Sequence, residues 1–290
     1  MILPPAPSGS PLSSTPSLYV VATPLGNLQD VSLRALAVLG AVDLIAAEDT
    51  RHSQRLLDAC GIRAPMLALH EHNEQEAAGK LIERLAEGRQ VALISDAGTP
   101  AVSDPGARAV ARVREAGHPV VPVPGACAAI AALSVSGWAD GGFRFVGFLS
   151  PKSGARRSRL AALADAAEAL VFYEAPHRVV ECVVDMAEVF GPSRGILVAR
   201  EMTKLHEQIV RLSLGDAAAW FAADPNRGRG EFVLVVDGAP AAVGLDAEAE
   251  RVLGLLLAEL PLKRAARLAA EITGAPKNAL YARALELKQD

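Results

Sequence analysis

Three glycine- and proline-rich turns contain the residues with the clearest capacity for binding chemistry. Their sequences are VATPLGNLQD, ISDAGTPAVSDPG and VPVPGACAA, and each includes or follows a short apolar run. In open α/β sheets, ligands bind outside the carboxyl ends of the strands, where backbone groups and helix starts converge. Three such turns in one stretch of chain therefore predict a cleft for a small molecule.

The composition of these turns narrows the class of ligand. They contain no Lys, and the chain has neither a GxxxxGKS or GxxxxGKT loop nor a GxGxxG fingerprint after its first apolar run. A loop that grips phosphate through Lys is therefore not expected. Backbone carbonyl and amide groups between apolar walls suit instead a ligand with an adenine ring, a ribose and an amino-acid tail.

Two other polar groups are explained by local structure. His70, His72 and Asn73 follow an apolar run, but HxH spacing without an identifiable third ligand favours a helix start or a polar contact over a metal site. Asp104 stands before a Pro-Gly pair, which predicts a helix N-cap rather than a catalytic carboxylate. We expect no bound metal ion.

The elements that must position these turns follow a regular order. Between Leu18 and Trp138, short apolar runs alternate with helix-period segments; the runs are LYVVA, VDLIAAE, PMLAL, VALISD and PVVPV. Such alternation is typical of a parallel α/β sheet. One helix is well marked, because NEQEAAGKLIERLAEG begins with a plausible N-cap at Asn73 and ends at Gly88.

A second unit begins near Phe143, and strands outnumber helices in it. Its predicted strands are FRFVGFL, ALVFYE, GILVAR, EQIVRLSL and EFVLVVDG, which indicate a mixed α+β domain. After a turn-prone stretch, the remaining residues predict three helices, interrupted at Pro261 and at Gly274–Pro276, that resemble a helix-turn-helix unit. Such a unit binds nucleic acid or only packs, and the sequence leaves both open.

These patterns divide the chain into five parts. The predicted parts are a disordered lead-in at 1–17, an N-terminal α/β domain at 18–140, a second α+β domain at 141–237, a linker at 238–246 and a helical domain at 247–290.

The composition indicates a cytoplasmic protein without a membrane span. The uncharged run Pro119–Ala139 is long enough to cross a bilayer, but its prolines and Gly125 divide it into a short strand, a turn and a small-residue helix. The first 17 residues lack the basic start and apolar stretch of a secretory signal. The three cysteines have no CxxC spacing, so free thiols in a reducing compartment are expected.

The net charge of −4 gives no overall attraction to nucleic acid, so any RNA contact must be local. One basic segment, PKSGARRSR, has four positive charges without aromatic residues, and we expect a mobile loop that closes on phosphate. A second cluster lies among the C-terminal helices. Ordinary solvated faces are the alternative for both.

Eight segments carry a resemblance to a known family. They are TPLGNLQDVSLRAL, AAEDTRHSQRLL, HEHNE, SDAGTPAVSDPG, VPGACAAIAAL, FYEAPHR, the ARE and TK stretch, and RGEFVLVV. Together they resemble the ribosomal RNA small-subunit methyltransferase I family, whose members have the tetrapyrrole-methylase-like fold. The resemblance runs from about Leu18 to Asp237, and the helical tail is also similar.

The resemblance implies a fold and an activity. The fold would be α/β, with a parallel-sheet N-terminal domain, a mixed-sheet second domain and a small helical unit. The activity would be transfer of a methyl group from S-adenosylmethionine (AdoMet) to the ribose 2′-oxygen of a cytidine in 16S ribosomal RNA near the decoding centre. A homodimer that acts on 16S RNA or the small ribosomal subunit, without a metal, would carry it out.

The resemblance also places donor contacts on this sequence. The implied contacts are Pro24, Asp96, Ala97, Gly98, Cys127, Ala128, Phe172, Tyr173 and Ala199. Many relatives carry Ser where this chain has Cys127, and Met202 takes a place often held by Leu.

Methyl transfer from a sulfonium is an in-line displacement, so oxygen, methyl carbon and sulfur must be held close to a line. A ribose hydroxyl also benefits from a positioned base or cation. The charged candidates are Glu48, Asp49, Arg51, Glu174, His177, Arg178, Arg200, Glu201 and Lys204. We hypothesise that Arg200 and Lys204 hold phosphate or the reacting ribose, while Glu174 or Glu201 orients or deprotonates the hydroxyl. The alternative is that these charges pair with one another as inter-domain salt bridges.

Contacts to RNA are expected from exposed basic residues. The candidates are Arg51, Lys152, Arg156, Arg157, Arg159, Arg178, Lys263 and Arg264. Two rival functions share parts of this reading: a tetrapyrrole-type methylase of small molecules, and a helix-turn-helix regulator that only senses AdoMet. The basic segment and the helical tail disfavour the first, and the number of charged groups near the cleft disfavours the second.

Overall fold

The computed structural model describes residues 11–240, 245 and 247–287, which form two compact units. The first unit comprises the chain up to Ala164 together with Glu168–Asp237, and the second comprises Asp165–Ala167 and the chain from Gly238 onward. The boundary expected at residue 140 lies inside the first unit and stays a prediction.

The first sheet is parallel, with strand order β3-β2-β4-β1-β5. Its strands are β1 (Leu18–Val21), β2 (Leu44–Ala47), β3 (Met66–Ala68), β4 (Val91–Ile94) and β5 (Val120–Val123). Its helices are η1 (Leu28–Asp30), α1 (Leu33–Leu39), α2 (Thr50–Ala59), α3 (Glu74–Ala86) and α4 (Ala107–Glu115). The predicted parallel α/β sheet is confirmed.

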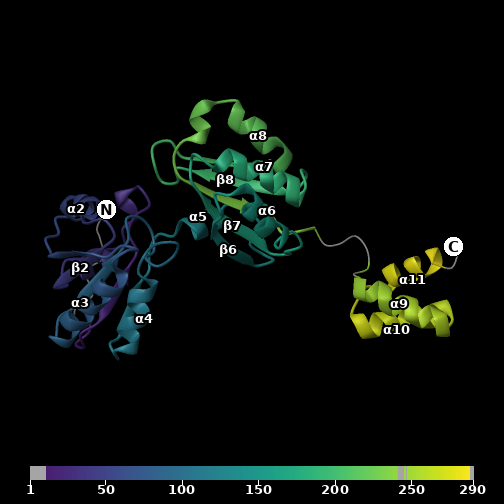
Figure 1. The fold of residues 1–290 in the computed structure, drawn as a ribbon, viewed down its shortest axis with the longest axis horizontal. Helices are drawn as coiled ribbons and strands as arrows, with labels where there is room; N and C mark the ends of the chain where they lie inside the picture. Colours follow the sequence, from purple (N-terminus) through teal and green to yellow (C-terminus); the bar gives the residue numbers. More distant parts are fainter. Residues whose placement is uncertain (1–10, 241–244, 246, 288–290) are drawn as a thin grey trace. The chain divides into compact units, whose positions relative to one another are not determined.

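Helices cover both faces of this sheet (Figure 1). Alternate strand residues point to opposite faces, so Tyr19 and Ile45 pack with α1 and α2 while Leu18 and Ala46 pack with α3 and α4. Burial on both faces explains why the strands are almost wholly apolar.

The second sheet is mixed, with strand order β6-β7-β10-β8-β9. Its strands are β6 (Phe143–Phe148), β7 (Ala169–Glu174), β8 (Gly195–Arg200), β9 (Gln208–Ser213) and β10 (Phe232–Val236). Its helices are α5 (Ala128–Ser134), α6 (Ser153–Ala161), α7 (Val179–Phe190), α8 (Leu214–Ala222) and η2 (Pro225–Gly228). The strands β6 and β7 run parallel, and the other neighbours are antiparallel. Small residues of α5 pack on one face, where Ala132 contacts the cluster that contains Val171 and Val235.

The ordered lead-in differs from the prediction. Ser13 donates its N–H to the Tyr19 hydroxyl at 2.6 Å, Leu12 packs against the first core, and Ser17 is fully buried. Disorder is therefore wrong for residues 11–17, because a buried tyrosine hydroxyl and Gln90 supply the hydrogen bonds that this segment needs. Residues 1–10 lie outside the described residues.

The basic segment PKSGARRSR is also different from the prediction. It forms the start of α6 rather than a mobile loop, and Arg156 and Leu160 are buried one turn apart. Arg, Ala and Leu are good helix formers, and one buried face is sufficient to dock such a helix.

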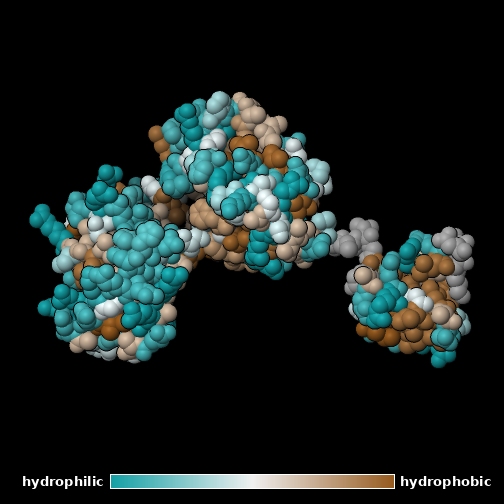
Figure 2. Space-filling view, viewed as in Figure 1, coloured by the Kyte–Doolittle hydropathy of each residue, from teal (hydrophilic) through white to brown (hydrophobic). Residues whose placement is uncertain are grey.

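The second unit contains α9 (Ala247–Glu259), α10 (Leu262–Thr273) and α11 (Lys277–Glu286), as predicted. Gly274 ends α10 in the left-handed conformation, with φ of 74°. Leu253, Ala266 and Leu280 are fully buried at the centre of the second unit. Leu255 and Ile272 are exposed, and Figure 2 shows hydrophobic side chains at the surface of this unit. Much of the expected linker, 241–244 and 246, lies outside the described residues.

The uncharged run Pro119–Ala139 forms β5, a turn and the short helix α5. Among the helices of the described residues, none has both the length and the hydropathy that crossing a bilayer requires.

The start of α4 depends on a side chain from α3. Glu74 Oε1 accepts hydrogen bonds from the N–H groups of Gly106, Arg108 and Ala109, at 2.8 to 3.1 Å. The N-cap is Gly106, with φ of 125°, so the prediction that Asp104 caps this helix is wrong. Glu74 is only 6% exposed, and a carboxylate there also complements the helix dipole.

We predict that Glu74→Ala lowers the free energy of unfolding by about 2 kcal/mol, because three buried N–H groups lose their acceptor. Denaturant unfolding measures this loss. Glu76→Ala is the matched control on the same helix, since Glu76 is exposed and forms a surface pair with Lys80, and it should leave the midpoint unchanged. Equal effects of the two substitutions would refute the capping role.

Candidate functional site

A cavity of about 390 Å³ lies in the first unit, at ends of strands from both sheets. Its walls come from the segments that follow β1, β2, β4 and β5, from the ends of β6, β7 and β8 with residues after β7 and β8, and from the start of β10. Seven of the residues expected to contact the donor line it: Asp96, Ala97, Gly98, Cys127, Ala128, Tyr173 and Ala199.

Pro24 and Phe172 do not line this cavity. Both are buried, and the neighbouring Leu25 and Tyr173 line it instead. Alternation along β7 places the Phe172 side chain on the opposite face of the sheet from that of Tyr173. Donor contacts at Pro24 and Phe172 stay predictions.

The loop after β4 is held in an uncommon backbone conformation. Ala101 and Ser103 have φ of 67° and 64°, and each such residue costs on the order of 1 kcal/mol or more. The loop is fixed at its base, where Thr23 and Gly98 exchange two backbone hydrogen bonds of 2.8 and 3.0 Å. Thr99 Oγ1 also donates to the Ala126 carbonyl at 2.9 Å. The loops after β1 and β5 thus hold the β4 loop against the cavity.

The lining carries acidic side chains and no basic ones. The described residues that line the cavity include Glu48, Asp96, Asp104, Glu174 and Glu231, but no Lys, Arg or His. Burial, with the Asp104 and Asp96 carboxylates, raises the pKa of Glu48 to about 7. Burial also raises the pKa of Asp104, and Asp96 adds to the effect. A positively charged ligand would relieve this repulsion, whereas a phosphate would increase it.

Tyr173 forms an aromatic wall of the cavity. Its ring makes edge contacts with Phe145 and Phe148, with centroids 5.0 and 5.7 Å away. Its hydroxyl accepts the Ala129 N–H at 3.1 Å. Burial and the Cys127 thiol raise the pKa of Tyr173 to about 12, so the phenol stays protonated at neutral pH.

Glu174 lines the cavity but is already paired. Its Oε1 accepts hydrogen bonds from Arg178 Nε at 2.8 Å, from Arg178 Nη2 at 2.5 Å and from the Ala175 N–H at 2.8 Å. Arg178 is largely buried in this pair, which joins residues four apart in the chain and is therefore not the inter-domain salt bridge expected as the alternative. A proton-accepting role for Glu174 and an RNA contact by Arg178 would each require that pair to open.

Arg200, Glu201 and Lys204 do not line the cavity. Arg200 is 7% exposed and donates to the Arg229 and His206 carbonyls at 2.5 and 3.1 Å, so it joins two loops. Lys204 Nζ lies 3.0 Å from Glu201 Oε1. Both cations are bonded within the protein, so the predicted contact of Arg200 and Lys204 with a phosphate or the reacting ribose would require these bonds to be shared or opened, and it stays a prediction.

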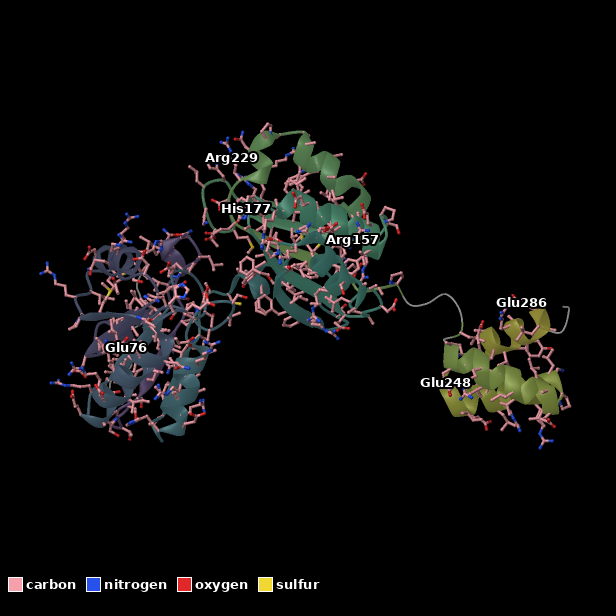
Figure 3. The ribbon with its side chains drawn as sticks, viewed as in Figure 1. Glu76, Arg157, His177, Arg229, Glu248 and Glu286 are labelled. Atoms are coloured by element: carbon pink, nitrogen blue, oxygen red, sulfur yellow. The ribbon has the colours of Figure 1, made fainter. Side chains whose placement is uncertain are left out.

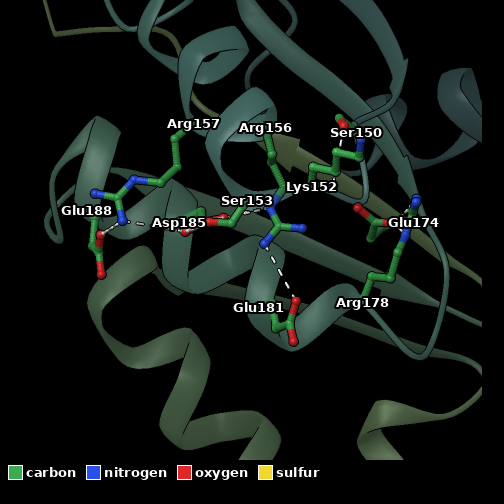
Figure 4. Close-up of polar contacts among 10 residues, drawn as sticks. All are labelled: Ser150, Lys152, Ser153, Arg156, Arg157, Glu174, Arg178, Glu181, Asp185 and Glu188. Carbon is green, nitrogen blue, oxygen red and sulfur yellow. Dashed lines mark hydrogen bonds and ion pairs between the residues drawn. The ribbon is translucent and has the colours of Figure 1, made fainter.

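The predicted RNA contacts of the segment PKSGARRSR separate into a buried and an exposed group. Figure 4 shows the ion pairs that Arg156 forms with Glu181 and Arg157 forms with Glu188. Arg156 is 1% exposed and donates from Nε to Asp185 Oδ2 at 2.6 Å, so it cannot meet a phosphate as expected. Arg157 pairs with Glu188 and is half exposed, while Lys152 and Arg159 are exposed.

The other predicted RNA contacts lie on separate elements. Arg51 is exposed on α2, and Lys263 and Arg264 are exposed on α10 of the second unit. Figure 3 shows Arg157 apart from His177, and His177 follows Pro176, which lines the cavity.

His70 and His72 do not form a metal site with Asn73. The Asn73 side chain accepts the His70 N–H at 2.8 Å and donates to the Ala68 carbonyl at 3.0 Å, which shapes the turn before α3. Across the described ranges, no cluster of three or more His, Cys, Asp or Glu side chains could hold a metal ion.

The sequence did not single out several lining residues. Thr99, Val102, Phe148 and Phe232 belong to segments whose neighbours were recognised, so proximity along the chain was the available signal. Glu231 stands in the RGEF segment, and its place at the cavity follows only from the antiparallel pairing of β10 with β7 and β8.

Comparison with known proteins identifies the family. The model of the Tetrapyrrole (Corrin/Porphyrin) Methylases matches residues 17–218, and the model of the RsmI C-terminal HTH domain matches residues 243–288. The ribosomal RNA small subunit methyltransferase I of Pseudomonas aeruginosa is 55% identical over 94% of this chain and 98% of its own length. The chain belongs to the ribosomal RNA small subunit methyltransferase I family.

A second member of the ribosomal RNA small subunit methyltransferase I family, from Haemophilus influenzae, is 52% identical over 91% of this chain and 94% of its own length. Among solved structures, the methyltransferase CobJ has a TM-score of 0.58 at 23% identity, covering 78% of this chain and 95% of that chain. Cobalt precorrin-4 methyltransferase CbiF has a TM-score of 0.57 at 18% identity, covering 76% and 94%. These two structures confirm the fold alone.

Substitutions at Arg156 and Asp185 can test whether these two side chains form a buried ion pair. We predict that Asp185→Leu lowers the free energy of unfolding by about 4 kcal/mol, because it leaves a buried guanidinium without its main partner. The double variant Arg156→Met/Asp185→Leu should recover much of that loss in the same denaturant experiment. If the double variant is as unstable as the sum of the two single variants, the two side chains do not act as a pair.

Proposed function

We propose that this protein transfers the methyl group of AdoMet to small-subunit ribosomal RNA. The observation that supports this most strongly is the identity of 55% with a ribosomal RNA small subunit methyltransferase I over 94% of this chain and 98% of the relative. Similarity on that scale includes the sheet-end loops, the second sheet and the helical unit together.

The cavity fits the donor. Its volume of about 390 Å³ is within the range of small-molecule sites. AdoMet carries a sulfonium, an ammonium and a carboxylate, so its net charge is positive. The described residues of the lining include Glu48, Asp96 and Asp104 and no basic side chain, while Glu174 and Glu231 are paired with Arg178 and Lys204. Backbone groups at Asp96–Gly98 and Cys127–Ala128 provide polar partners, and Tyr173 provides an apolar wall. The donor, when bound, supplies a methyl group activated by the adjacent positive sulfur.

We assign separate tasks to the residues of the cavity. The loop after β4 and the start of α5 hold the donor, and the Glu48 carboxylate faces its positive charge. Glu174 fixes the segment after β7 through Arg178. The exposed basic residues Arg51, Lys152, Arg157, Arg159, Lys263 and Arg264 supply phosphate contacts.

The finer assignment is the ribose 2′-hydroxyl of a cytidine in 16S RNA near the decoding centre. We further propose that the protein acts as a homodimer in the cytoplasm. Support for both comes from the family resemblance of the sheet-end motifs, and the three cysteines, all free, fit a reducing compartment.

The test incubates the protein with methyl-labelled AdoMet and separated ribosomal subunits. We predict label in the small-subunit RNA, within an alkali-resistant dinucleotide, because 2′-O-methylation removes the hydroxyl that cleaves the neighbouring phosphodiester. Label in a small molecule, in large-subunit RNA or nowhere contradicts the proposal.

A pair of glycine variants connects this activity to the cavity. Gly98 has φ of 78°, and an added Cβ would lie 3.2 Å from Leu25 Cδ2, whereas Gly88 has φ of 86° and open space around it. Both substitutions by Ala carry the same backbone strain. Gly98→Ala should lose label transfer, while Gly88→Ala should retain it.

A pH dependence follows from Glu48. Its pKa of about 7 means that the carboxylate fraction rises as the pH increases through neutrality. If AdoMet binds only the carboxylate form, its Kd should be about eightfold weaker at about pH 6 than at about pH 7.5. Calorimetry measures the ratio of these two Kd values. Glutamine cannot ionise, so Glu48→Gln should lose the part of the pH dependence that comes from position 48. An unchanged ratio in Glu48→Gln would exclude Glu48 as the group responsible.

A further inference from the structure

The turn after β8 is strained and tied to the start of β10. Glu201 and Thr203 have φ of 50° and 67°, which non-glycine residues adopt only when surrounding contacts hold them. Glu201 N–H donates to the Glu231 carbonyl, and Glu201 Oε1 accepts the Glu231 N–H, both at 2.9 Å. Met202 and Glu231 line the cavity. The shape of this turn therefore fixes part of the cavity wall.

Lys204 extends from this turn across the loop after β1. A Cβ added at Gly26 would lie only 2.5 Å from Lys204 Cγ and 3.0 Å from Lys204 Cε. The lysine stem thus lies directly on the Gly26 backbone, in the space that any larger residue would occupy. Gly26 follows Leu25, which also lines the cavity.

The lysine charge is bound at the end of this stem. Lys204 Nζ lies 3.0 Å from Glu201 Oε1 and 3.0 Å from Glu231 Oε2, and the side chain is 26% exposed. Two carboxylates brought to one ammonium would repel each other without it. One side chain therefore connects three segments: the loop after β1, the turn after β8 and the residues before β10.

We propose that Lys204 is a positioning residue that sets the spacing between the loop after β1 and the segment before β10, and thereby the affinity of the cavity for AdoMet. This inference rests on the proposed function. It replaces direct phosphate contact by Lys204, because both ends of the side chain are already engaged inside the protein. It also explains why position 26 is a glycine, because only a residue without a side chain leaves room for the stem of Lys204.

A partly exposed ion pair contributes little to global stability, so removal of Lys204 should leave the protein folded. Its effect should instead be local. Without the ammonium, the Glu231 side chain is released from the Glu201 side chain, and the loop after β1 loses the stem that rests on it. The cavity wall then becomes less well defined, which raises the cost of ordering it around a ligand.

The test is a double-mutant cycle on the Kd of AdoMet, measured by calorimetry with the full chain. Gly26→Ala should weaken binding about tenfold, because the new methyl group displaces the stem from its place. Lys204→Ala should weaken binding about fivefold through loss of the link. The double variant should bind no more weakly than Lys204→Ala alone, because the shortened side chain at position 204 leaves space for the methyl group introduced by Gly26→Ala.

Gly79→Ala is the matched control, since Gly79 has open space around it and, like Gly26, no left-handed φ. It should bind AdoMet as the unsubstituted protein does. Circular dichroism and gel filtration establish that each variant is folded. If Gly26→Ala does not fold, two measurements on Lys204→Ala decide whether Lys204 has the positioning role: its Kd for AdoMet and the salt dependence of its RNA binding.

The outcomes separate the inference from the proposed function. No AdoMet uptake by the unsubstituted protein overturns the proposed function. Uptake with additive effects of the two substitutions, or with a Kd unchanged in Lys204→Ala, overturns the positioning role alone. A Lys204→Ala variant with normal AdoMet affinity and a shallower salt dependence of RNA binding would assign Lys204 to phosphate contact instead.

Discussion

Charge asymmetry in the cavity is the constraint on which the rest of the account depends. Five acidic residues and no basic one are among the described residues that line the cavity, but Glu174 is paired with Arg178 and Glu231 with Lys204. The repulsion is therefore among Glu48, Asp96 and Asp104, and with burial it raises the pKa of Glu48 to about 7. Such a site stores electrostatic repulsion that a cation relieves. The same site would reject the phosphate groups that glycine-rich loops bind in many nucleotide-binding proteins.

The fold concentrates these carboxylates because parallel strands end at one edge. Glu48 follows β2, and Asp96 and Asp104 belong to the loop after β4, its neighbour in the sheet. The hydrogen bonds between Thr23 and Gly98 bring the β1 loop to the same place. The second sheet adds Tyr173 and the segment before β10, so the site needs both sheets although each has a separate core.

Much of this arrangement could be predicted from the sequence, since apolar runs and glycine-rich turns are local signals. The parallel sheet and the mixed sheet follow from them, whereas the seven expected residues that line the cavity were implied by the family resemblance. The absence of Phe172 from the lining could not be predicted from alternation alone, because the successive residues Phe232 and Val233 of β10 both line the cavity. Ion pairs between residues far apart in the sequence could not be predicted. Arg156 with Asp185, and Lys204 with Glu231, depend on which helices and loops meet after folding.

The basic residues show most clearly what cannot be predicted from the sequence. A sequence shows that Arg156 and Arg159 belong to one charged run, but only packing decides that one of them is buried against α7 while the other faces solvent. A run of basic residues therefore predicts an RNA interface only when the residues that folding buries are left out of it.

The most direct measurement compares the affinities of adenosine compounds that differ in charge. Calorimetry with AdoMet, adenosine and ATP on the same preparation separates electrostatic selection from recognition of the shared nucleoside. The account predicts that AdoMet binds more tightly than adenosine and that ATP binds more weakly than either. ATP binding as tight as that of AdoMet would contradict it.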